Sequence, residues 1–472
     1  MSNNKIYWRG TEELEKDSAF LKNSQKEFAQ ELPIEQFLGK KDLDSTNTSR
    51  RDFLKFMGFG ITAATLAACE TPIIKSLPYV VKPNEVMPGI ANYYASTYFD
   101  GSDYAGILVK TREGRPIHIE GNKSAPLTNG GVSARVNSSV LSLYNTRRFQ
   151  QPMKGGVDSD WAAVDGEIKN ELTSIKANGG NVRILSSTII SPSSLSLIDE
   201  MKSYVGEGLV KHVSHDAISY SGVIESNKRT HGVAAVPNYH FDKANVVVSI
   251  GSDFLVNGIN SIGFSNGYAK MRNPENGMSK HYQFETTLTT TGSNADVRGA
   301  IKPSEQGAIA LMLLNAISGG SSNASLANDD NNVAAKVADA ATKLKSSRGK
   351  SIVICGSNDP NVQSVVNGIN EALGNYGNTI DLNAPLHLRK GSDKQVAELI
   401  GEMNSGAVSA LFVIDCDPVY SLPASWGFAD AMSKVKTSVA MMEKANATSS
   451  ICGYVCPTGH FLESWNDANP TG

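Results

Sequence analysis

Short apolar segments alternate with amphipathic ones from about residue 151 onward. The apolar segments are too short for helices and are expected to be strands. They cover Val182–Ser186, Val246–Ile250, Tyr282–Thr286, Ile352–Cys355, Ala410–Asp415 and Thr437–Met441. Helices are predicted over Ser194–Tyr204, Glu305–Ile317, Asn361–Leu373 and Asp393–Asn404. Apolar strands separated by helices are typical of an α/β protein with a parallel, doubly wound sheet.

Several predicted strands end in small or polar residues. Gly251-Ser252-Asp253, Gly356-Ser357-Asn358 and Cys416-Asp417-Pro418 each follow one of them. Open α/β sheets bind ligands at the carboxyl ends of their strands. This edge is therefore the expected place for any ligand of the α/β region.

The chain ahead of this region has a different pattern. Residues 70–92 contain four prolines and are predicted to be an extended connector. Ile107–Lys110 and Ile117–Glu120 are short strands joined by a turn at Glu113-Gly114-Arg115. The sequence thus predicts three parts: a leader over 1–69, a connector with a small β-rich opening domain over 70–150, and an α/β region over 151–472. The segment Gly319–Asn332 is expected to be an exposed insertion. The final residues complete no element, and the sequence is expected to stop inside a larger protein.

An export signal lies near residue 50. The heptapeptide Ser49-Arg50-Arg51-Asp52-Phe53-Leu54-Lys55 has the form of a twin-arginine signal. The apolar stretch that follows is too short to span a bilayer, which needs about 20 residues. It ends in Leu66-Ala67-Ala68-Cys69, which has the form of a lipobox with Cys69 as the acylated residue. We expect export by the Tat pathway and a lipid anchor on the periplasmic side of the cytoplasmic membrane.

Composition adds few constraints. The 472 residues suffice for two or three domains, and the contents of 40 % apolar and 19 % charged residues are ordinary for a globular protein. The formal net charge of -3 gives no support for nucleic-acid binding, which favours a basic surface. After Cys69, no apolar run is long enough for a transmembrane helix.

Several blocks resemble the molybdopterin oxidoreductases in order and spacing. In the opening domain they are Gly106-Ile-Leu-Val-Lys, Gly114-Arg-Pro-Ile-His-Ile-Glu-Gly-Asn122 and Leu143-Tyr144-Asn145 through Arg147 or Arg148. Later blocks are Val246–Phe254, Phe284–Asp296 with Arg298, Pro303-Ser304-Glu305, Asp417–Tyr420 with Leu422-Pro423, and Pro457–Asp467. The long leader beginning Tyr7-Trp8-Arg9 resembles a Tat-variant-translocated group of this family, the large iron–sulfur subunit of alternative complex III. The resemblance implies the N-terminal half of that subunit.

The resemblance also indicates which positions match the iron–sulfur cluster ligands of the family. Many family members hold a 4Fe–4S cluster just before the Gly-Ile-Leu-Val strand, and such a cluster is ligated by cysteine thiolates. The matching positions here are Tyr98, Gly101, Ala105 and Ser133. None of them is cysteine, so we expect no cluster in this segment; clusters are expected in the C-terminal half that the resemblance implies.

A molybdenum ligand is also hard to place. The family uses Cys, selenocysteine, Ser or Asp, and no cysteine lies between Cys69 and Cys355. Ser214, Asp216 and Ser219 are the remaining candidates, with solvated loop residues as the simpler interpretation. We therefore expect the fold without the molybdopterin cofactor.

The remaining cysteines are expected to be structural. Cys355 and Cys416 end predicted strands, where a thiol acts as a small buried apolar group. Cys452 and Cys456 are interpreted as structural or as a disulfide. With His460 they also suggest a metal site, but structural zinc needs four ligands and no second pair is present. Among the histidines, His212, His215 and His460 lie near polar groups. His460 and Glu463 are predicted to form a structural pair, and no catalytic residue is identified.

The first hypothesis is a scaffold or electron-transfer subunit of a quinol-oxidising respiratory complex. Its implied partners are cytochrome c-type subunits, integral membrane quinol-binding subunits and the Tat translocon. This segment would carry no redox step itself. The alternatives are a molybdopterin-dependent oxidoreductase with a non-cysteine metal ligand, and a cofactor-free exported lipoprotein that acts as an interaction module.

Overall fold

The computed structural model describes residues 86–320, 324–326, 329 and 331–472. Chain contacts divide the protein between Met87 and Pro88, and Pro88–Gly472 forms one compact unit. The predicted leader, twin-arginine signal and Cys69 lie outside the described residues, as does part of the predicted insertion Gly319–Asn332. In the described part, no helix has both the length and the apolar character needed to cross a membrane.

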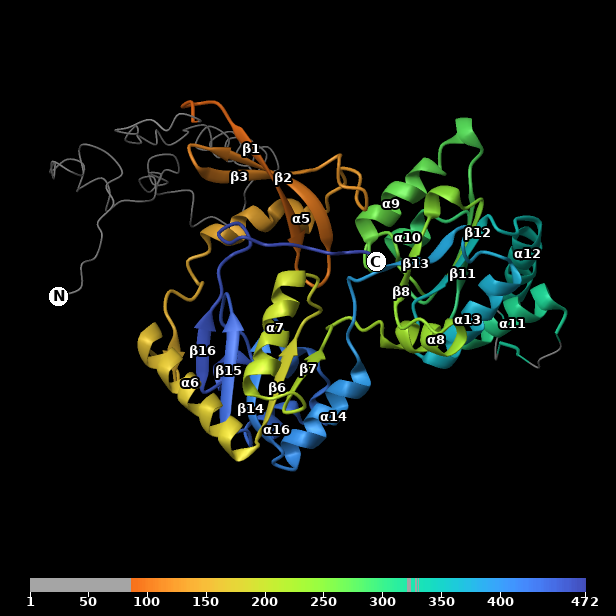
Figure 1. The fold of residues 1–472 in the computed structure, drawn as a ribbon. Coiled ribbons are helices and arrows are strands. Elements are labelled where there is room, and N and C mark those ends of the chain that lie inside the picture. The colour runs from red at the N-terminus through yellow and green to blue at the C-terminus, as the bar shows by residue number, and fades with distance from the viewer. Residues whose placement is uncertain (1–85, 321–323, 327–328, 330) are drawn as a thin grey trace, which may run out of the picture. The chain divides into compact units, whose positions relative to one another are not determined.

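The opening domain is a three-stranded antiparallel sheet in the order β1-β2-β3 (Figure 1). Its strands are β1 (Asn92–Phe99), β2 (Tyr104–Arg112) and β3 (Arg115–Gly121). Glu113 and Gly114 both have positive φ, the geometry of a two-residue hairpin turn that matches strand twist. Helix α5 (Ala134–Ser138) and the 3-10 helix η1 (Ser139–Tyr144) contact β3.

A second sheet has seven strands in the order β5-β4-β16-β15-β14-β6-β7. Five are parallel: β6 (Asn181–Ser186), β7 (Val210–Ser214), β14 (Val408–Ile414), β15 (Thr437–Met442) and β16 (Tyr454–Pro457). The hairpin of β4 (Met153–Lys154) and β5 (Val157–Asp158) extends one edge in antiparallel fashion. Its helices include α6 (Trp161–Asn178), α7 (Pro192–Val205), α14 (Asp393–Asn404) and α16 (Phe428–Met432).

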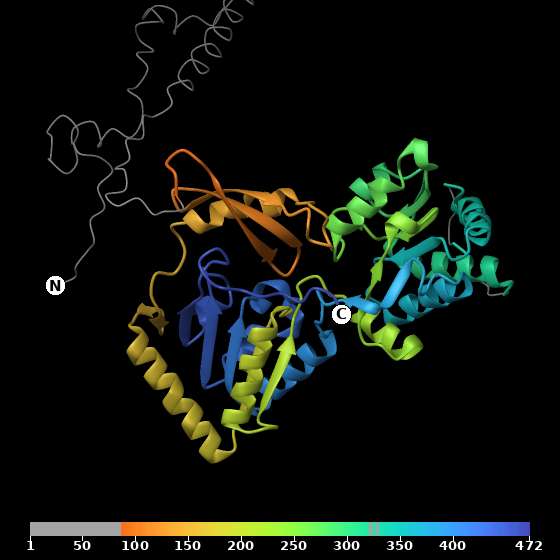
Figure 2. The ribbon, with the colours of Figure 1, turned by 45° about the horizontal axis from the view of Figure 1, so that its top comes forward.

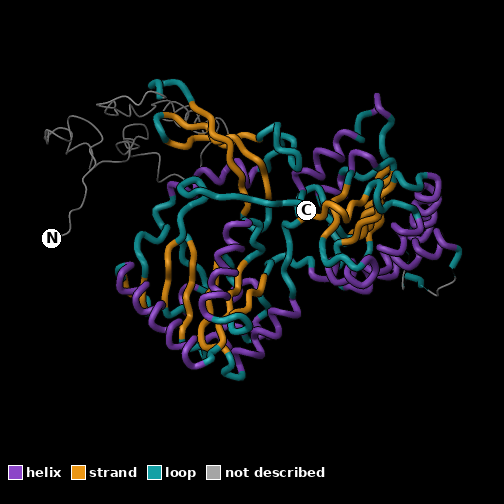
Figure 3. The backbone as a smooth tube through the Cα atoms, viewed as in Figure 1, coloured by secondary structure: helices purple, strands orange, loops and turns teal. Residues whose placement is uncertain are grey.

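Helices cover both faces of this sheet, as Figure 3 shows. Leu185 and Val413 belong to a core shared with α14 and α16. Ile184 and Phe412, their neighbours in sequence, belong to a separate core shared with α6 and α7. Burial on both faces explains why the strands are apolar almost throughout.

Between β7 and β14 the chain leaves this sheet and builds another. Parallel strands β9 (Val246–Ile250), β10 (Lys280–Glu285), β11 (Val297–Ala300) and β12 (Ser351–Cys355) form it in the order β11-β10-β9-β12. Its helices include α8 (Ser221–His231), α9 (Ser261–Lys270), α11 (Gln306–Ser318), α12 (Val333–Ser346) and α13 (Pro360–Ala372) (Figure 2). Strands β8 (Val236–Tyr239) and β13 (Ile380–Leu386) form a separate antiparallel pair.

The predicted α/β class is confirmed. All six predicted strands of the α/β region and all four predicted helices are present, with ends shifted by a few residues. The parallel strands are distributed over two sheets. The sequence pattern does not predict strands β1, β4, β5, β7, β8, β11, β13 and β16, nor helices α5, α6, α8, α9, α12 and α16.

Candidate functional site

The four positions that match cluster ligands of the molybdopterin oxidoreductases lie around one end of the opening sheet. Tyr98 and Ala105 are direct cross-strand partners in β1 and β2. Gly101 lies in the turn that joins these strands, with φ of 78°. Ser133 is the N-cap of α5, where its hydroxyl accepts a hydrogen bond from the Val136 N–H.

Two aspartates tie these positions together. The Tyr98 hydroxyl donates to Asp100 Oδ2 at 2.9 Å, and the Ser133 hydroxyl donates to Asp103 Oδ2 at 2.6 Å. The backbone N–H of Asp103 donates to Asp100 Oδ1 at 2.8 Å, which joins the two pairs. Arg135 contributes a longer ion pair to Asp100 at 3.8 Å. We call Tyr98, Asp100, Asp103 and Ser133 the opening-domain network.

This network does not fit an iron–sulfur cluster. The four matching positions present a phenol, a glycine, a methyl group and a hydroxyl, and none supplies the thiolate that iron requires. Burial is the main cause that raises the pKa of Tyr98, followed by the charge of Asp100, so the phenol keeps its proton. Ala105 is fully buried in the opening-domain core. These side chains hold the end of the hairpin against α5.

The candidate molybdenum ligands lie in the segment that follows β7. Asp216 is buried and accepts four hydrogen bonds from the protein. The donors are Thr188 N at 3.1 Å, Thr188 Oγ1 at 2.8 Å, Lys390 N at 3.2 Å and Gly391 N at 2.8 Å. Three of these donors reach Oδ2 and one reaches Oδ1, so protein groups use most of the accepting capacity of this carboxylate.

Ser219 is engaged through its hydroxyl, whereas Ser214 is held through its backbone carbonyl. Ser214 ends β7, and its carbonyl accepts from Ser392 N at 3.2 Å. The Ser219 hydroxyl donates to Asp393 Oδ2 at 2.8 Å. The structure thus places all three candidates near the segments that connect the seven-stranded and four-stranded sheets. Asp216 lies where the chain leaves the seven-stranded sheet, and its donors Lys390 and Gly391 lie where the chain returns to it. This contact therefore joins the two segments that connect the seven-stranded and four-stranded sheets.

A row of buried polar side chains follows one face of β10. His281, Gln283 and Glu285 alternate with Tyr282 and Phe284, which belong to the core of the four-stranded sheet. The Tyr268 hydroxyl contacts His281 Nδ1 at 3.0 Å, and His281 Nε2 contacts Gln283 Oε1 at 3.3 Å. Gln283 Nε2 donates to Glu285 Oε2 at 3.2 Å. The row forms a continuous hydrogen-bonded chain.

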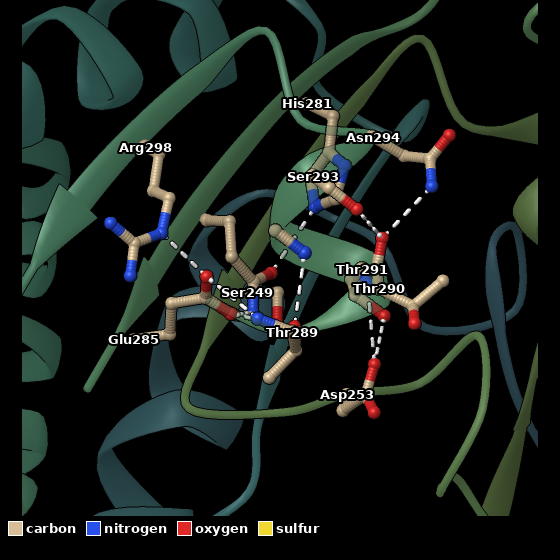
Figure 4. Close-up of polar contacts among 12 residues, drawn as sticks. Ser249, Asp253, His281, Glu285, Thr289, Thr290, Thr291, Ser293, Asn294 and Arg298 are labelled. Atoms are coloured by element: carbon tan, nitrogen blue, oxygen red, sulfur yellow. Dashed lines mark hydrogen bonds and ion pairs between the residues drawn. The ribbon is translucent and has the colours of Figure 1, made fainter. Parts of the chain in front are cut away.

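Glu285 ends this chain at the carboxyl edge of the sheet (Figure 4). Its carboxylate accepts from Arg298 Nε at 2.6 Å and from Thr289 Oγ1 at 2.7 Å. Nearby, Asp253 Oδ1 accepts from Thr291 Oγ1 at 2.6 Å. Burial acts to raise the pKa of Glu285, but the hydrogen bonds from Arg298, Thr289 and Gln283 together outweigh it and lower the pKa. The carboxylate is charged and fully engaged, which makes this a structural anchor at the expected ligand edge.

The sequence pattern does not predict this polar row as a unit. The block Phe284–Asp296 contributes only to the family resemblance, and the apolar residues Tyr282 and Phe284 of β10 obscure the alternating polar residues. Burial of His281 lowers its pKa to about 4, so the ring is neutral near pH 7. The sequence does contain a signal for this row: His281, Gln283 and Glu285 follow one another at intervals of two, and residues so spaced share one face of a strand.

The segment Pro457–Asp467 returns to the opening domain. The predicted pair of His460 and Glu463 is present through the backbone, because His460 N donates to Glu463 Oε2 at 3.1 Å. The His460 ring instead contacts Ser142 Oγ at 2.7 Å. The Glu463 carboxylate binds Arg148 at two points, one of them at 3.2 Å. Two of the blocks that carry the family resemblance are therefore joined directly.

The cysteines are free thiols in the described part of the chain. The disulfide interpretation for Cys452 and Cys456 is wrong, because the two residues pack into different cores, Cys452 with α14 and α16 and Cys456 with α6. Burial raises the pKa of Cys456 and Cys355 to about 11 and that of Cys452 to about 12. These thiols behave as buried apolar groups.

The other two histidines are held by serines. His212 Nε2 contacts Ser186 Oγ at 2.7 Å, and His215 Nε2 contacts Ser421 Oγ at 2.7 Å. Burial lowers the pKa of both rings. Within the described residues, no three side chains of His, Cys, Asp or Glu are grouped as a metal site.

Comparison with known proteins relates the chain to molybdopterin-type proteins. No family model matches it. It is 27 % identical over 479 aligned positions to the menaquinone reductase, molybdopterin-binding-like subunit of Nitratidesulfovibrio vulgaris. The match covers 89 % of this chain and 66 % of that protein, so this chain spans just under two thirds of its relative.

The fold is similar to that of acetylene hydratase from Pelobacter acetylenicus, with a TM-score of 0.57 and 15 % identity. The match covers 78 % of this chain and 61 % of that structure. The predicted molybdopterin-oxidoreductase-like fold is confirmed by this likeness. The relative and the fold together support a relationship of this chain to the molybdopterin superfamily.

Proposed function

We propose that this chain is a pterin-enzyme-like scaffold subunit of a membrane respiratory complex that exchanges electrons with quinones. More specifically, it corresponds to the N-terminal half of the large iron–sulfur subunit of alternative complex III, in which quinol is oxidised. In this proposal the chain carries neither a molybdenum site nor a cluster. It docks other subunits and supports a cluster-bearing part of the complex.

The opening-domain network is the observation that carries this proposal. In a cluster-bearing enzyme the positions of Tyr98 and Ser133 supply thiolates, whereas here these two side chains are hydrogen-bonded to Asp100 and Asp103. The fold is retained, yet the groups that would perform the first electron transfer are replaced by groups that hold the domain together. Asp216 gives the same indication for the metal, since four protein donors occupy its carboxylate.

The relative supports a role in quinone-linked electron transfer. Its name describes a subunit of a menaquinone reductase that is molybdopterin-binding-like. That name describes quinone reduction, whereas alternative complex III oxidises quinol. Membranes that contain this chain distinguish the directions: quinol-dependent reduction of cytochrome c supports our proposal, and quinone reduction without it favours the opposite direction.

Export and lipid anchoring belong to the same proposal. The twin-arginine signal with Arg50 and Arg51 and the acylated Cys69 would place the chain on the periplasmic face of the cytoplasmic membrane. Cys69→Ser should release the chain from the membrane fraction in a strain without the other subunits, and Thr71→Ser should leave it bound. Retention of Cys69→Ser at the membrane in that strain would contradict the anchor.

The deciding experiment measures molybdenum, pterin and iron per copy of this chain in the complex gently solubilised from its membrane. We expect iron from other parts of the complex, without molybdenum or pterin. Near-stoichiometric molybdenum with pterin would contradict the scaffold and favour a molybdopterin enzyme with a non-cysteine ligand. Purification without cytochrome and membrane subunits would instead favour the lipoprotein interaction module.

A further inference from the structure

Strand β1 is a border strand of the opening sheet, and its outer edge pairs with no other strand among the described residues. The order β1-β2-β3 places it at the border, with β2 as its neighbour (Figure 1). In the described part of the chain, no hydrogen bond is made by the backbone of Tyr93 or Ala95 on the side away from β2. An unpaired strand edge presents a row of donors and acceptors to which another strand can pair.

The direction of these groups follows from the next strand. The Gly106 carbonyl accepts a hydrogen bond from Asn122 N at 2.9 Å, so the backbone N–H and C=O of Gly106 point toward β3 and away from β1. Thr97 lies opposite Gly106 in the register of β1 and β2. In an antiparallel pair of strands, opposite residues alternate between pairs whose backbone N–H and C=O groups bond to each other and pairs whose groups point away from each other. Tyr93, Ala95 and Thr97 therefore turn their N–H and C=O groups outward, and Tyr94 and Ser96 turn theirs toward β2.

The opposite edge of the same sheet is protected. On β3, the Pro116 carbonyl accepts from the Tyr144 hydroxyl at 2.7 Å, and the Ile119 carbonyl accepts from Asn137 Nδ2 at 2.9 Å. Side chains of η1 and α5 thus satisfy that edge. Only one of the two borders of this sheet has this protection among the described residues.

Strand β1 also lacks the features that keep strand edges from pairing. Its sequence, NYYASTYF, has no charged residue and no proline. Its register with β2 is unbroken over eight residue pairs, so no bulge turns the edge away. Proteins normally protect a bare edge with charge, proline, a bulge or a covering segment. The edge has no charge, proline or bulge, and near its end the Thr97 hydroxyl donates to Asn466 Oδ1 at 3.5 Å. Its Tyr93 and Ala95 part, exposed among the described residues, is suited to a partner.

The charge beside this edge indicates the kind of partner. Lys110 lies opposite Tyr93, with Nζ 5.7 Å from the centre of its ring. Lys110, Arg112 and Arg115 form no ion pair with any carboxylate of the described chain. Residues 88–150 contain seven basic and four acidic residues, in a protein whose net charge is -3. The edge therefore lies in a basic part of an acidic protein.

We propose that the outer edge of β1 binds an extended, acidic segment of a partner polypeptide, which adds a fourth strand to the opening sheet. The backbone of Tyr93, Ala95 and Thr97 would pair with this segment. Its acidic side chains would lie beside Lys110, and Tyr93 and Tyr94, each about half exposed, would pack against its apolar side chains. The proposal concerns a partner surface and is independent of whether a pterin or cluster is bound.

Hydrogen exchange of the full chain, alone and in the complex solubilised from its membrane, tests the pairing. We expect exchange at the amides of Tyr93, Ala95 and Thr97 to slow by about tenfold or more in the complex. The amides of Tyr94 and Ser96 already face β2 and should change little. Equal exchange in the two samples would overturn the proposal.

Three substitutions at exposed Ala95 test the mode and the charge. Ala95→Pro removes an outward donor, and Ala95→Glu repels an acidic strand, so both should abolish the protection. Ala95→Lys adds a side chain of similar size that attracts an acidic strand, so this variant should retain the protection. Equal loss with Glu and Lys would overturn the acidic assignment. Protection that survives Ala95→Pro in a folded chain, shown by unchanged exchange of the β2 amides, would overturn strand addition.

A photoreactive phenylalanine at position 93 identifies the occupant. A crosslink to an extended acidic segment of another subunit, lost in Ala95→Glu, supports the proposal. A crosslink to a second copy, or to this chain's own residues ahead of Pro88, would overturn it. The same group at Tyr420, which is 83 % exposed on a short helix after β14, serves as the control position.

Discussion

Arg148 and Glu463 form a two-point ion pair between residues 315 positions apart in sequence. Arg148 also pairs with Glu443 at 3.0 Å and donates to the Leu143 carbonyl at 3.0 Å. One guanidinium thus joins the end of the opening domain to the segment after β15 and to the last segment of the chain. A planar guanidinium suits this role, because its donors are fixed in a fork.

Replacing Arg148 should therefore destabilise the protein more than an exposed ion pair would. Arg148→Met leaves Glu443 and Glu463 without a cation, and we expect a loss of about 1–3 kcal/mol in the free energy of unfolding. Chemical denaturation measures it. Lys436→Met breaks the exposed pair with Glu171 and should cost about 0–1 kcal/mol. Equal losses would show that the Arg148 contacts are not a structural link.

Ser133 is predicted to stabilise the opening domain in two ways. Its hydroxyl caps α5 and donates to buried Asp103. Ser133→Ala removes both contacts, and we expect a loss of about 1–2 kcal/mol, whereas Ser133→Thr should keep most of the stability. Thermal denaturation compares them with Ser392→Ala, which removes a cap of α14 without a buried carboxylate. A smaller loss for Ser133→Ala than for Ser392→Ala would contradict the network.

The sequence predicted the apolar framework and missed contacts that join distant segments. Val246–Ile250 is apolar except for Ser249 and was identified to the residue, because a strand buried on both faces has an unmistakable composition. Strand β7, with Lys211 and His212 among its five residues, has no such signal. The return of the chain to the first sheet after a long excursion is a tertiary event, which local patterns do not encode.

The site shows the same division. The replaced cluster positions could be located by counting from Gly106, because the spacing of thiolate ligands is a local property. The contact between Ser133 and Asp103 could not, since the two residues are 30 positions apart. Tyr282 and Phe284 identified β10 as apolar, and the polar face of the same strand became evident only with its burial.

His281 predicts a pH dependence of stability. Its pKa falls from 6.5 to about 4 on folding, mainly because burial disfavours the charged ring. Between these values the unfolded chain binds a proton that the folded chain does not, so stability decreases as the pH falls through this window. Above about pH 6.5 the ring is neutral in both the folded and the unfolded chain, and His281 no longer lowers the stability.

We expect His281 to account for a loss of about 2 kcal/mol between pH 7 and pH 5. His281→Asn, which cannot be charged, should lose correspondingly less over the same interval, although it starts from lower stability. Urea denaturation at both pH values gives the difference. His118→Asn, at a partly exposed position of β3, is the control and should follow the wild-type curve. Parallel curves for His281→Asn and wild type would contradict a neutral buried ring.

Substitution of Asp216 distinguishes two roles for its carboxylate, a metal ligand or a structural clasp, by which we mean the hydrogen bonds that join Asp216 to Thr188, Lys390 and Gly391. Its four donors come from Thr188, which follows β6, and from Lys390 and Gly391 on the returning segment. Asp216→Asn removes the charge and turns an amide N–H₂ toward donors. We expect a loss of about 2–4 kcal/mol, together with faster proteolysis of the segments that connect the two sheets.

Gly391→Ala tests the same contact from the other side. A Cβ at Gly391 would lie 2.8 Å from Asp216 Oδ2 and 2.9 Å from the Asp216 backbone nitrogen, so the clasp must shift to admit it. Gly401→Ala, in open space on α14, is the control and should be neutral or stabilising. If Asp216 is a clasp, both clasp variants loosen the crossing and the metal content of the complex does not change. If Asp216→Asn instead removed molybdenum while Gly391→Ala did not, Asp216 would be a ligand and the scaffold proposal would fail.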